Sequence, residues 1–211
     1  MKLYSVRSEY KYAELTESSI EKNPFKQFEH WLNDAMNAKV NEPTAMSLAT
    51  FGIDGFPDSR IVLLKDYGND GFTFFTNYNS NKGKSIAKHP AVGLHFFWPE
   101  LERQIRISGF AEKTSDEISD NYFNSRPVLS QIAAIVSNQS SKIESREILQ
   151  NSFVSEKEKI GDDKIKRPDS WGGFMVKPVK FEFWQGRESR LHDRILYEKT
   201  ENNWTIFRLA P

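Results

Sequence analysis

Basic side chains alternate along one short segment near the C-terminal end of the chain. The stretch 181–194 begins with aromatic residues at alternate positions, as a strand would, and then turns at 185–186. Beyond the turn, Arg190, His192 and Arg194 occupy alternate positions, so an extended backbone would place two guanidiniums and an imidazole on one face. Such a face favours an anion between the cations, and a phosphorylated ligand is the natural candidate. The alternative is a surface strand whose charges are solvated.

Cations also flank apolar strands in the first half of the chain. Arg60 and Lys65 lie at the two ends of the apolar run 61–64, although each charge could simply snorkel at a strand end. Farther along, a strand that ends at 74–77 is followed by the polar run 80–84, where a helix begins. Helix N-termini bind phosphates because their free N–H groups and the helix dipole point at the anion. A capped surface helix has the same pattern.

A third group combines a phenol, a guanidinium and a hydroxyl. Tyr122 and Arg126 are four residues apart and therefore share one face of a predicted helix. Pro127 ends that helix, and Ser130 follows in the next turn. These three side chains, if they converge, suit a phosphate dianion. A surface Tyr–Arg pair beside a capping serine is the alternative.

The segment 181–194, with its Trp, Gln, Arg, His, Asp and Arg, resembles the C-terminal signature of the pyridoxine/pyridoxamine 5′-phosphate oxidases. These are FMN enzymes that make pyridoxal 5′-phosphate, and the likeness runs from about residue 7 to the end of the chain. The resemblance implies an FMN site formed by Arg60, Ile61, Val62, Leu63, Leu64, Lys65, Phe75, Thr76, Asn81, Lys82, Gln104, Gln139, Ser140, Trp184 and Arg194. It implies a substrate site formed by Arg7, Tyr10, Lys65, Tyr122, Arg126, Ser130, Arg190 and His192, with Arg190 and His192 as the catalytic pair at the pyridine ring.

Two positions depart from the family's usual pattern. Asn81 stands where an arginine is often found, and Phe75 stands where a tyrosine is common. FMN affinity would then depend more on Arg60 and Lys82. Gln104 keeps an amide that both donates and accepts hydrogen bonds, which suits the flavin pyrimidine edge, although an ordinary outward-facing strand glutamine would look the same.

The implied reaction oxidises C4′ of pyridoxamine or pyridoxine 5′-phosphate, most simply by hydride transfer to flavin N5. Dioxygen then takes the electrons and leaves as hydrogen peroxide, and the amine substrate also releases ammonia, in the last step of pyridoxal 5′-phosphate synthesis or salvage. Members of the family are homodimers with FMN at the subunit interface. Two alternatives stay open: an FMN oxidase on the same barrel that acts on another ring, such as a phenazine precursor, and a non-enzymatic flavin or pyridoxal-phosphate carrier.

Composition excludes several other classes. Lys and Arg together number 29, as do Asp and Glu, so the formal net charge is zero and no basic stripe argues for nucleic acid. There are no cysteines and the four histidines are scattered, so neither a disulfide nor a metal site is expected. The chain has no long apolar run and no apolar leader segment, which favours a cytoplasmic protein that does not enter membranes.

The order of elements favours a mainly β protein with inserted helices, an α+β fold built on an antiparallel barrel. The resemblance implies that this barrel is the FMN-binding split barrel of the family. Residues 1–22 are expected to form a mobile N-terminal arm and 23–211 a single domain, with a flexible loop at 161–170. Strands are predicted at 44–51, 59–65, 71–76, 91–98, 101–113, 172–184, 194–199 and 204–209, the last two joined by a turn at 202–203. Helices are predicted from Pro24, at 80–88, from a capping box at Thr114 and Glu117 to about 125, and at about 129–136 and 144–160.

Overall fold

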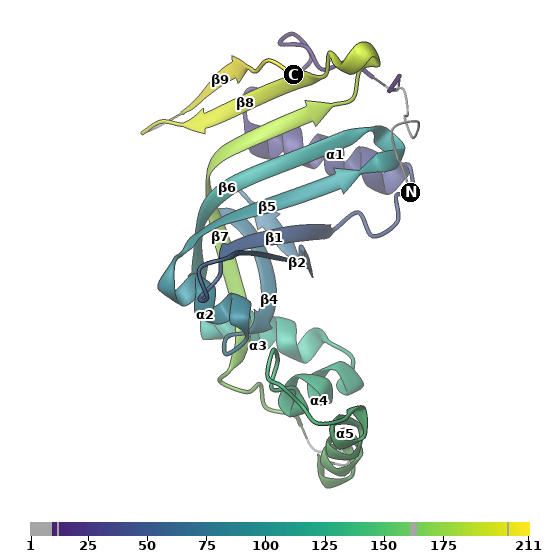
Figure 1. The fold of residues 1–211 in the computed structure, drawn as a ribbon, viewed down its shortest axis with the longest axis vertical. Helices are drawn as coiled ribbons and strands as arrows, with labels where there is room; N and C mark the ends of the chain where they lie inside the picture. Colours follow the sequence, from purple (N-terminus) through teal and green to yellow (C-terminus); the bar gives the residue numbers. More distant parts are fainter. Residues whose placement is uncertain (1–9, 12, 161–163, 202) are drawn as a thin grey trace.

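The computed structural model describes residues 10–11, 13–160, 164–201 and 203–211. Arg7, the first part of the 161–170 loop and Asn202 of the last predicted turn lie outside the described residues. The elements in chain order are α1 (Pro24–Asn37), β1 (Ala45–Phe51), β2 (Pro57–Leu63), β3 (Asp66–Gly68), β4 (Gly71–Asn77), α2 (Asn81–Lys88), β5 (Ala91–Trp98), η1 (Pro99–Leu101), β6 (Arg103–Lys113), α3 (Asp116–Ser125), α4 (Val128–Val136), α5 (Arg146–Ile160), β7 (Trp171–Gln185), η2 (Glu188–Arg190), β8 (Asp193–Lys199) and β9 (Trp204–Arg208) (Figure 1).

The strands of the described residues form one antiparallel sheet of nine. Its order is β2-β1-β5-β6-β7-β4-β3, and β8 and β9 extend the sheet from the second half of β7. Figure 1 shows this sheet curling along the long axis, with β8 and β9 at one end and α3, α4 and α5 at the other. The prediction of a mainly β, antiparallel fold with inserted helices is confirmed.

The long strand β7 joins the two ends of the molecule. Its first half pairs with β4 and its second half pairs with β8, while β6 accompanies it along most of its length. The register between β6 and β7 shifts at Ser108/Gly109, where a Cβ on Gly109 would lie 2.4 Å from the carbonyl oxygen of Lys177. Such an irregularity bends a strand pair, so it helps the sheet to curl.

The helix α1 fills the inside of this curl. Asn23 caps it by accepting a hydrogen bond from the Phe25 N–H, and Pro24 occupies the first turn, as the sequence predicts. Its buried stripe includes Phe28 and Trp31. The ring of Phe28 packs edge-on against Phe72 at 4.8 Å, and this aromatic core fixes α1 against the sheet.

Three local details differ from the sequence predictions. The cap of α3 is Ser115, whose Oγ accepts from the Ile118 N–H, whereas Thr114 instead shares a hydrogen bond with Ser119. Leu101 belongs to the short helix η1 rather than to β6. The strand β3 was not predicted, because three residues are too few for a periodic pattern to show.

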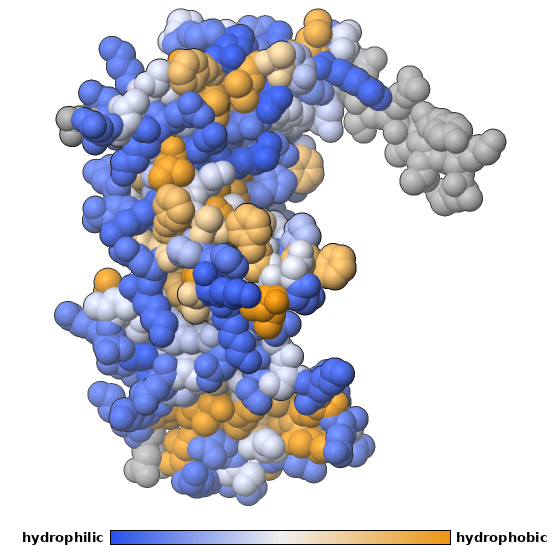
Figure 2. All heavy atoms as spheres, turned by 60° about the vertical axis from the view of Figure 1, so that its left-hand side comes forward, coloured by the Kyte–Doolittle hydropathy of each residue, from blue (hydrophilic) through white to orange (hydrophobic). Residues whose placement is uncertain are grey.

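The helices α3, α4 and α5 form an end of their own with a small second core around Phe123, Ile132 and Trp171. No residue of α5 is fully buried, and its apolar side chains Leu149 and Val154 remain exposed. In Figure 2 apolar side chains gather at this helical end and also stand out from the middle of the molecule.

The chain just before α1 packs along β8 and β9. Leu15 is buried and its N–H donates to Asp193, while Arg208 binds both carboxylate oxygens of Glu17. The hydroxyl of Tyr197 donates to the carbonyl oxygen of Glu21 at 2.7 Å. These contacts hold the segment before α1 at the end of the molecule where η2 also lies.

No helix in the described parts of the chain is long and apolar enough to cross a membrane.

Candidate functional site

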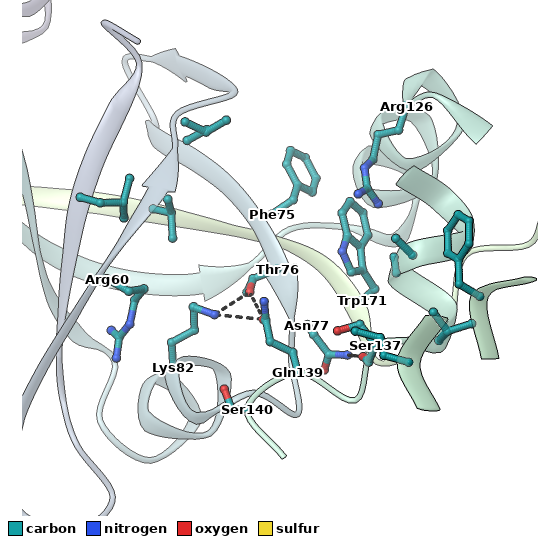
Figure 3. Close-up of a pocket in the computed structure, with 18 of the residues that line it drawn as sticks. Arg60, Phe75, Thr76, Asn77, Lys82, Arg126, Ser137, Gln139, Ser140 and Trp171 are labelled. Atoms are coloured by element: carbon teal, nitrogen blue, oxygen red, sulfur yellow. Dashed lines mark hydrogen bonds between the residues drawn. The ribbon is translucent and has the colours of Figure 1, made fainter. Parts of the chain in front are cut away.

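A cleft of about 1120 Å³ lies where the sheet meets the helical end. Its walls come from β2, β4, α2, the C-terminal end of α3, α4, the loop after α4, α5 and the start of β7 (Figure 3). The structure brings many of the predicted residues together here, although the sequence separates them by up to 80 positions. The predicted residues that line the cleft are Arg60, Ile61, Val62, Leu63, Lys65, Phe75, Thr76, Lys82, Tyr122, Arg126, Gln139 and Ser140.

Lys82 is a buried cation at the floor of the cleft. Its ammonium donates to the side-chain oxygens of Gln139 at 3.0 Å and Thr76 at 3.3 Å (Figure 3). It also donates to the Ser80 hydroxyl at 3.5 Å. All three acceptors are neutral. Burial lowers the pKa of Lys82, and the nearby Arg60 guanidinium lowers it further. An anion bound beside Lys82 would relieve both effects.

The loop after α4 reaches back to the start of α2. Ser140 has a left-handed backbone with φ of 72°, and its Oγ accepts from the N–H of Asn81 at 3.2 Å. Asn77 holds the same loop by donating to the carbonyl oxygen of Ser137. The Asn81 side chain is exposed and does not line the cleft. Asn81 therefore contributes to the cleft through its backbone N–H, which holds Ser140.

The strand β2 offers the cleft an apolar edge and one guanidinium. Ile61 is 67% exposed and Leu63 is also exposed, whereas Leu64 turns into the core, so the predicted cofactor role of Leu64 concerns its backbone. Arg60 lines the cleft, but its guanidinium is bound to Asp58 and to the Thr50 hydroxyl. A ligand that uses Arg60 must therefore share it with these partners.

Tyr122 and Arg126 form the opposite wall with the aromatic rings of Phe75 and Trp171. The rings of Phe75 and Tyr122 stack at 4.0 Å, and the guanidinium carbon of Arg126 lies 4.7 Å from the centroid of Trp171. Nη1 of Arg126 is buried and has no hydrogen-bond partner among the described residues. Burial lowers the pKa of Arg126 because it disfavours the charged guanidinium. A bound anion would offset this loss of solvation. Ser130, in the first turn of α4, is half-buried and does not line this cleft.

The remaining predicted residues gather elsewhere, on the outer face of β6, β7 and β8. Trp184 pairs with Gln104 on one side and with Arg194 on the other, so the three side chains form a row across the sheet. The ring of His192 lies 4.7 Å from that of Trp184, and the ring of Tyr10 lies 5.6 Å from both. Figure 1 shows β8 at one end of the molecule and α3, α4 and α5, whose residues line the cleft, at the other.

The prediction that Arg190, His192 and Arg194 share a face of an extended segment is wrong. Arg190 belongs to the short helix η2, where it and Ser189 have left-handed backbones with φ of 61° and 56°. The strand begins only at Asp193, and Arg194 binds Glu182 at 2.9 Å. A tight turn therefore replaces the extended backbone, and a local alternation pattern does not reveal it.

The imidazole of His192 is held in a defined state. Its Nδ1 accepts a hydrogen bond of 3.1 Å from the Arg187 N–H, so in the neutral ring the proton resides on Nε2. Burial lowers the pKa of His192, and the charge of Arg190 lowers it further. The side chain is therefore neutral at pH 7, with an N–H available for a ligand.

Sequence reasoning missed Trp171 and the cleft-facing side of α5. Trp171 is the first residue of β7 and reads as an ordinary core aromatic, so its proximity to Arg126 depends on tertiary structure. The cleft residues of α5 include Leu149 and Phe153, which the helical pattern assigns only to an apolar stripe. No group of His, Asp or Glu suited to a metal ion occurs among the described residues.

Comparisons with known proteins agree with this arrangement. Residues 32–156 match the family described as pyridoxamine 5′-phosphate oxidase, and residues 171–211 match the pyridoxine 5′-phosphate oxidase C-terminal dimerisation region. The pyridoxine/pyridoxamine 5′-phosphate oxidase of Haemophilus ducreyi is 51% identical over the full length of both chains. The enzyme of that name from Nostoc punctiforme is 49% identical over 98% of this chain and 97% of its own.

Among solved structures, PhzG from Burkholderia lata, crystallised with tetrahydrophenazine-1-carboxylic acid, is 28% identical. It superimposes with a TM-score of 0.87 and covers 94% of this chain and 98% of its own. A pyridoxamine 5′-phosphate oxidase-related, FMN-binding protein from Nostoc punctiforme is 17% identical with a TM-score of 0.73, over 91% of this chain and all of its own, which shows a shared fold.

The curled antiparallel sheet with a cation-lined cleft beside its inserted helices thus defines a protein of the split-barrel class. Within that class, the chain belongs to the pyridoxamine 5′-phosphate oxidase family. The family and the fold that the sequence motifs predict are both confirmed.

Proposed function

We propose that this protein is an FMN-dependent oxidase that converts pyridoxamine and pyridoxine 5′-phosphate to pyridoxal 5′-phosphate with dioxygen as acceptor. The observation that carries this proposal is the pair of separate cationic positions in one cleft. Lys82 lies at the floor with neutral partners, and Arg126 lies at the wall with a buried unpaired N–H group. Two phosphorylated molecules, cofactor and substrate, would satisfy both positions.

The cleft fits FMN in size and in the chemistry of its lining. Lys82, Thr76, Gln139 and Ser140 would hold the cofactor phosphate near the start of α2, where helix N–H groups also favour an anion. The exposed apolar edge of β2 would pack against a flat ring system. Bound FMN supplies the redox chemistry, because it accepts the two electrons that leave C4′ and passes them to dioxygen.

The protein's own part is to hold the substrate. Lys65, Tyr122 and Arg126 would bind its phosphate, with Ser130 close by on α4. Binding of the phosphate, which is remote from the reacting carbon, would fix the orientation of C4′ for the reaction. His192, with its proton on Nε2, would donate a hydrogen bond to the phenolic oxygen on the pyridine ring, and Arg190 would stabilise negative charge on that oxygen.

A complete site needs a second copy of the chain. One chain places Gln104, Trp184 and Arg194 in a row across β6, β7 and β8, with His192 beside Trp184, and none of these four residues, the outer-face group, lines its own cleft. The same face of the sheet carries the exposed apolar side chains Phe97 and Phe110. We therefore propose a homodimer in which FMN lies at the interface, between the cleft of one subunit and the outer-face group of its partner.

The phenazine-type alternative is supported less well. PhzG is 28% identical to this chain, whereas the named pyridoxine/pyridoxamine 5′-phosphate oxidases are about half identical over the full length. A carrier would bind flavin or pyridoxal phosphate without turnover, so an activity measurement separates it from the proposed enzyme.

The test is an anaerobic absorbance spectrum of the FMN-loaded protein before and after pyridoxine 5′-phosphate is added. The flavin band at about 450 nm should bleach and should return when air is admitted. A bound flavin that stays oxidised would direct the search to another substrate, and failure to bind flavin would contradict the enzyme proposal itself. A cytoplasmic location is part of the proposal, and fractionation of the source cells would check it.

A further inference from the structure

Arg126 is partly buried and is held in an unusual way for a guanidinium. Its backbone is fixed at the end of α3, where its carbonyl oxygen accepts from the Gln131 amide at 2.8 Å. Its side chain lies over the face of Trp171 at 4.7 Å, and Nη1 keeps no hydrogen-bond partner among the described residues. An aromatic face stabilises a cation without using its N–H groups. The hydrogen-bonding capacity of Nη1 is therefore left for a ligand.

The ring of Trp171 also belongs to a stack that includes the other wall residues of the cleft. Phe75 and Trp171 are nearly parallel, at 12° and 5.6 Å, and Tyr122 and Trp171 are parallel within 8° at 6.1 Å. Trp171 is 7% exposed, so this packing leaves its ring little freedom. One ring therefore supports both the phenol and the guanidinium that face the cleft.

Arg167 ties this tryptophan to the helix that carries Tyr122 and Arg126. Its guanidinium donates to the Trp171 carbonyl oxygen at 2.6 Å, to Asp120 at 2.6 Å and to Asp116 at 2.8 Å. Both aspartates belong to α3. The Arg167 side chain is only 8% exposed, so one guanidinium joins the start of β7 to α3 through three hydrogen bonds.

The approach of β7 to α3 and β4 also depends on the two glycines after Trp171. A Cβ on Gly172 would lie 2.2 Å from the Tyr78 hydroxyl, and one on Gly173 would lie 2.5 Å from Thr114. Only glycine permits contact this close at both positions. The sequence Trp-Gly-Gly thus places the indole against the wall of the cleft.

We propose that Trp171 is a positioning residue for phosphate recognition: Arg167 ties its backbone to α3, and its indole holds the Arg126 guanidinium at the wall of the cleft, with Nη1 left for an anion. The inference deepens the proposed function and rests on it for the identity of the phosphorylated substrate. It makes Trp171 a determinant of the preference for phosphorylated over unphosphorylated substrates, although Trp171 itself need not touch the phosphate.

The experiment compares Trp171→Leu with Trp171→Phe in the FMN-loaded protein. Trp171→Leu removes the aromatic face and should raise KM for pyridoxine 5′-phosphate by about tenfold or more, with a much smaller change in kcat. Trp171→Phe keeps a ring under the guanidinium and should recover most of the loss. Turnover of unphosphorylated pyridoxine should not change, because that substrate offers Arg126 no anion.

A matched control separates positioning from general loss of packing. Trp31 is also buried and also lies beneath an arginine, with the Arg103 guanidinium 4.5 Å from its ring, but it does not line the cleft. Trp31→Leu should lower thermal stability without a selective rise in KM for the phosphorylated substrate. Should Trp171→Leu not fold, Asp120→Asn, which weakens the Arg167 link, should produce a smaller rise of the same selective kind.

Inorganic phosphate provides a readout that does not need turnover. Phosphate affinity, measured as an inhibition constant or by calorimetry, should be weaker in both Trp171→Leu and Arg126→Ala than in the wild type, and flavin affinity should stay unchanged. Equal losses for phosphorylated and unphosphorylated substrates, or unchanged phosphate affinity, would overturn the positioning role. Failure of the wild-type protein to oxidise pyridoxine 5′-phosphate would instead contradict the proposed function and leave the phosphate-binding comparison to decide the role of Trp171.

Discussion

The ammonium of Lys82 donates a 3.0 Å hydrogen bond to the side-chain oxygen of Gln139, a residue 57 positions farther along the chain. This contact joins the first turn of α2 to the loop after α4, and the Asn81 N–H bond to Ser140 runs beside it. Two segments that are distant in sequence thus meet at one buried charge. The cofactor phosphate is therefore expected to bind where they meet.

Replacement of Lys82 by alanine should weaken FMN binding at least tenfold, or about 1.4 kcal/mol. The physical reason is that the hydrogen-bond acceptors of this buried ammonium among the described residues are all neutral, so a bound anion would stabilise the charge. Lys84→Ala is the matched control, because Lys84 lies on the same helix but is exposed. Flavin fluorescence titration of both variants makes the measurement, and equal affinities for wild type and Lys82→Ala would refute the role.

The titration of His192 should occur below pH 6.5, because burial and the Arg190 charge both lower its pKa. Protonation would place a hydrogen on Nδ1 and break the bond from the Arg187 N–H. Thus kcat/KM should be flat around neutral pH and fall as the pH drops through this lowered pKa. Arg190→Ala should move the titration back towards 6.5 without reaching it, since burial is the larger cause.

An NMR titration of the His192 imidazole in wild type and in Arg190→Ala checks this prediction directly. The other three histidines of the chain serve as internal references. A His192 midpoint above 6.5 in the wild type, or a further decrease in Arg190→Ala, would contradict the environment described for this ring.

The ion pair between Glu17 and Arg208 should make stability sensitive to acid. Hydrogen bonding to Arg208 lowers the pKa of Glu17 from 4.5 to about 2. Because the folded-state pKa is the lower one, the stabilisation is complete above about 4.5 and is lost as the pH falls towards 2. Glu17→Gln should therefore unfold at a lower temperature than wild type at neutral pH, and this difference in melting temperature should shrink below pH 4.5.

Glu158, an exposed residue of α5, provides the control for that experiment. Glu158→Gln should not reproduce the pH-dependent difference, because it removes a carboxylate without this arginine partner. A constant difference between Glu17→Gln and wild type across the acid range would show that the side chain acts through packing rather than through its charge.

The sequence predicts those features that depend on local pattern. The start of α1 at Pro24 and the shared face of Tyr122 and Arg126 follow from local sequence alone. The left-handed turn at Arg190 does not, because its backbone angles depend on the contacts that η2 makes after folding. The Trp171–Arg126 contact cannot be predicted from the sequence either, since it depends on how closely β7 approaches α3.

The division of the site between two subunits yields the most demanding prediction. Arg126→Ala damages the cleft, and His192→Ala damages the outer-face group, so each homodimer of a single variant should have little activity. In a mixed dimer, the cleft of the Arg126→Ala subunit faces the outer-face group of the His192→Ala subunit, so that site carries both changes. The other site joins two unchanged halves and carries neither. Random re-association of equal amounts should then restore about a quarter of wild-type activity, because half of the dimers each hold one intact site.

The matched control mixes Lys82→Ala with Arg126→Ala. Both changes lie in the cleft, so every site of the mixed dimer keeps one defect and activity should stay low. Each mixture is unfolded, refolded together with FMN and assayed beside the separate variants. If the site belonged wholly to one chain, the Arg126→Ala and His192→Ala mixture would recover no more activity than the control. Recovery in that mixture alone therefore requires that the cleft of one chain is completed by the outer face of the other.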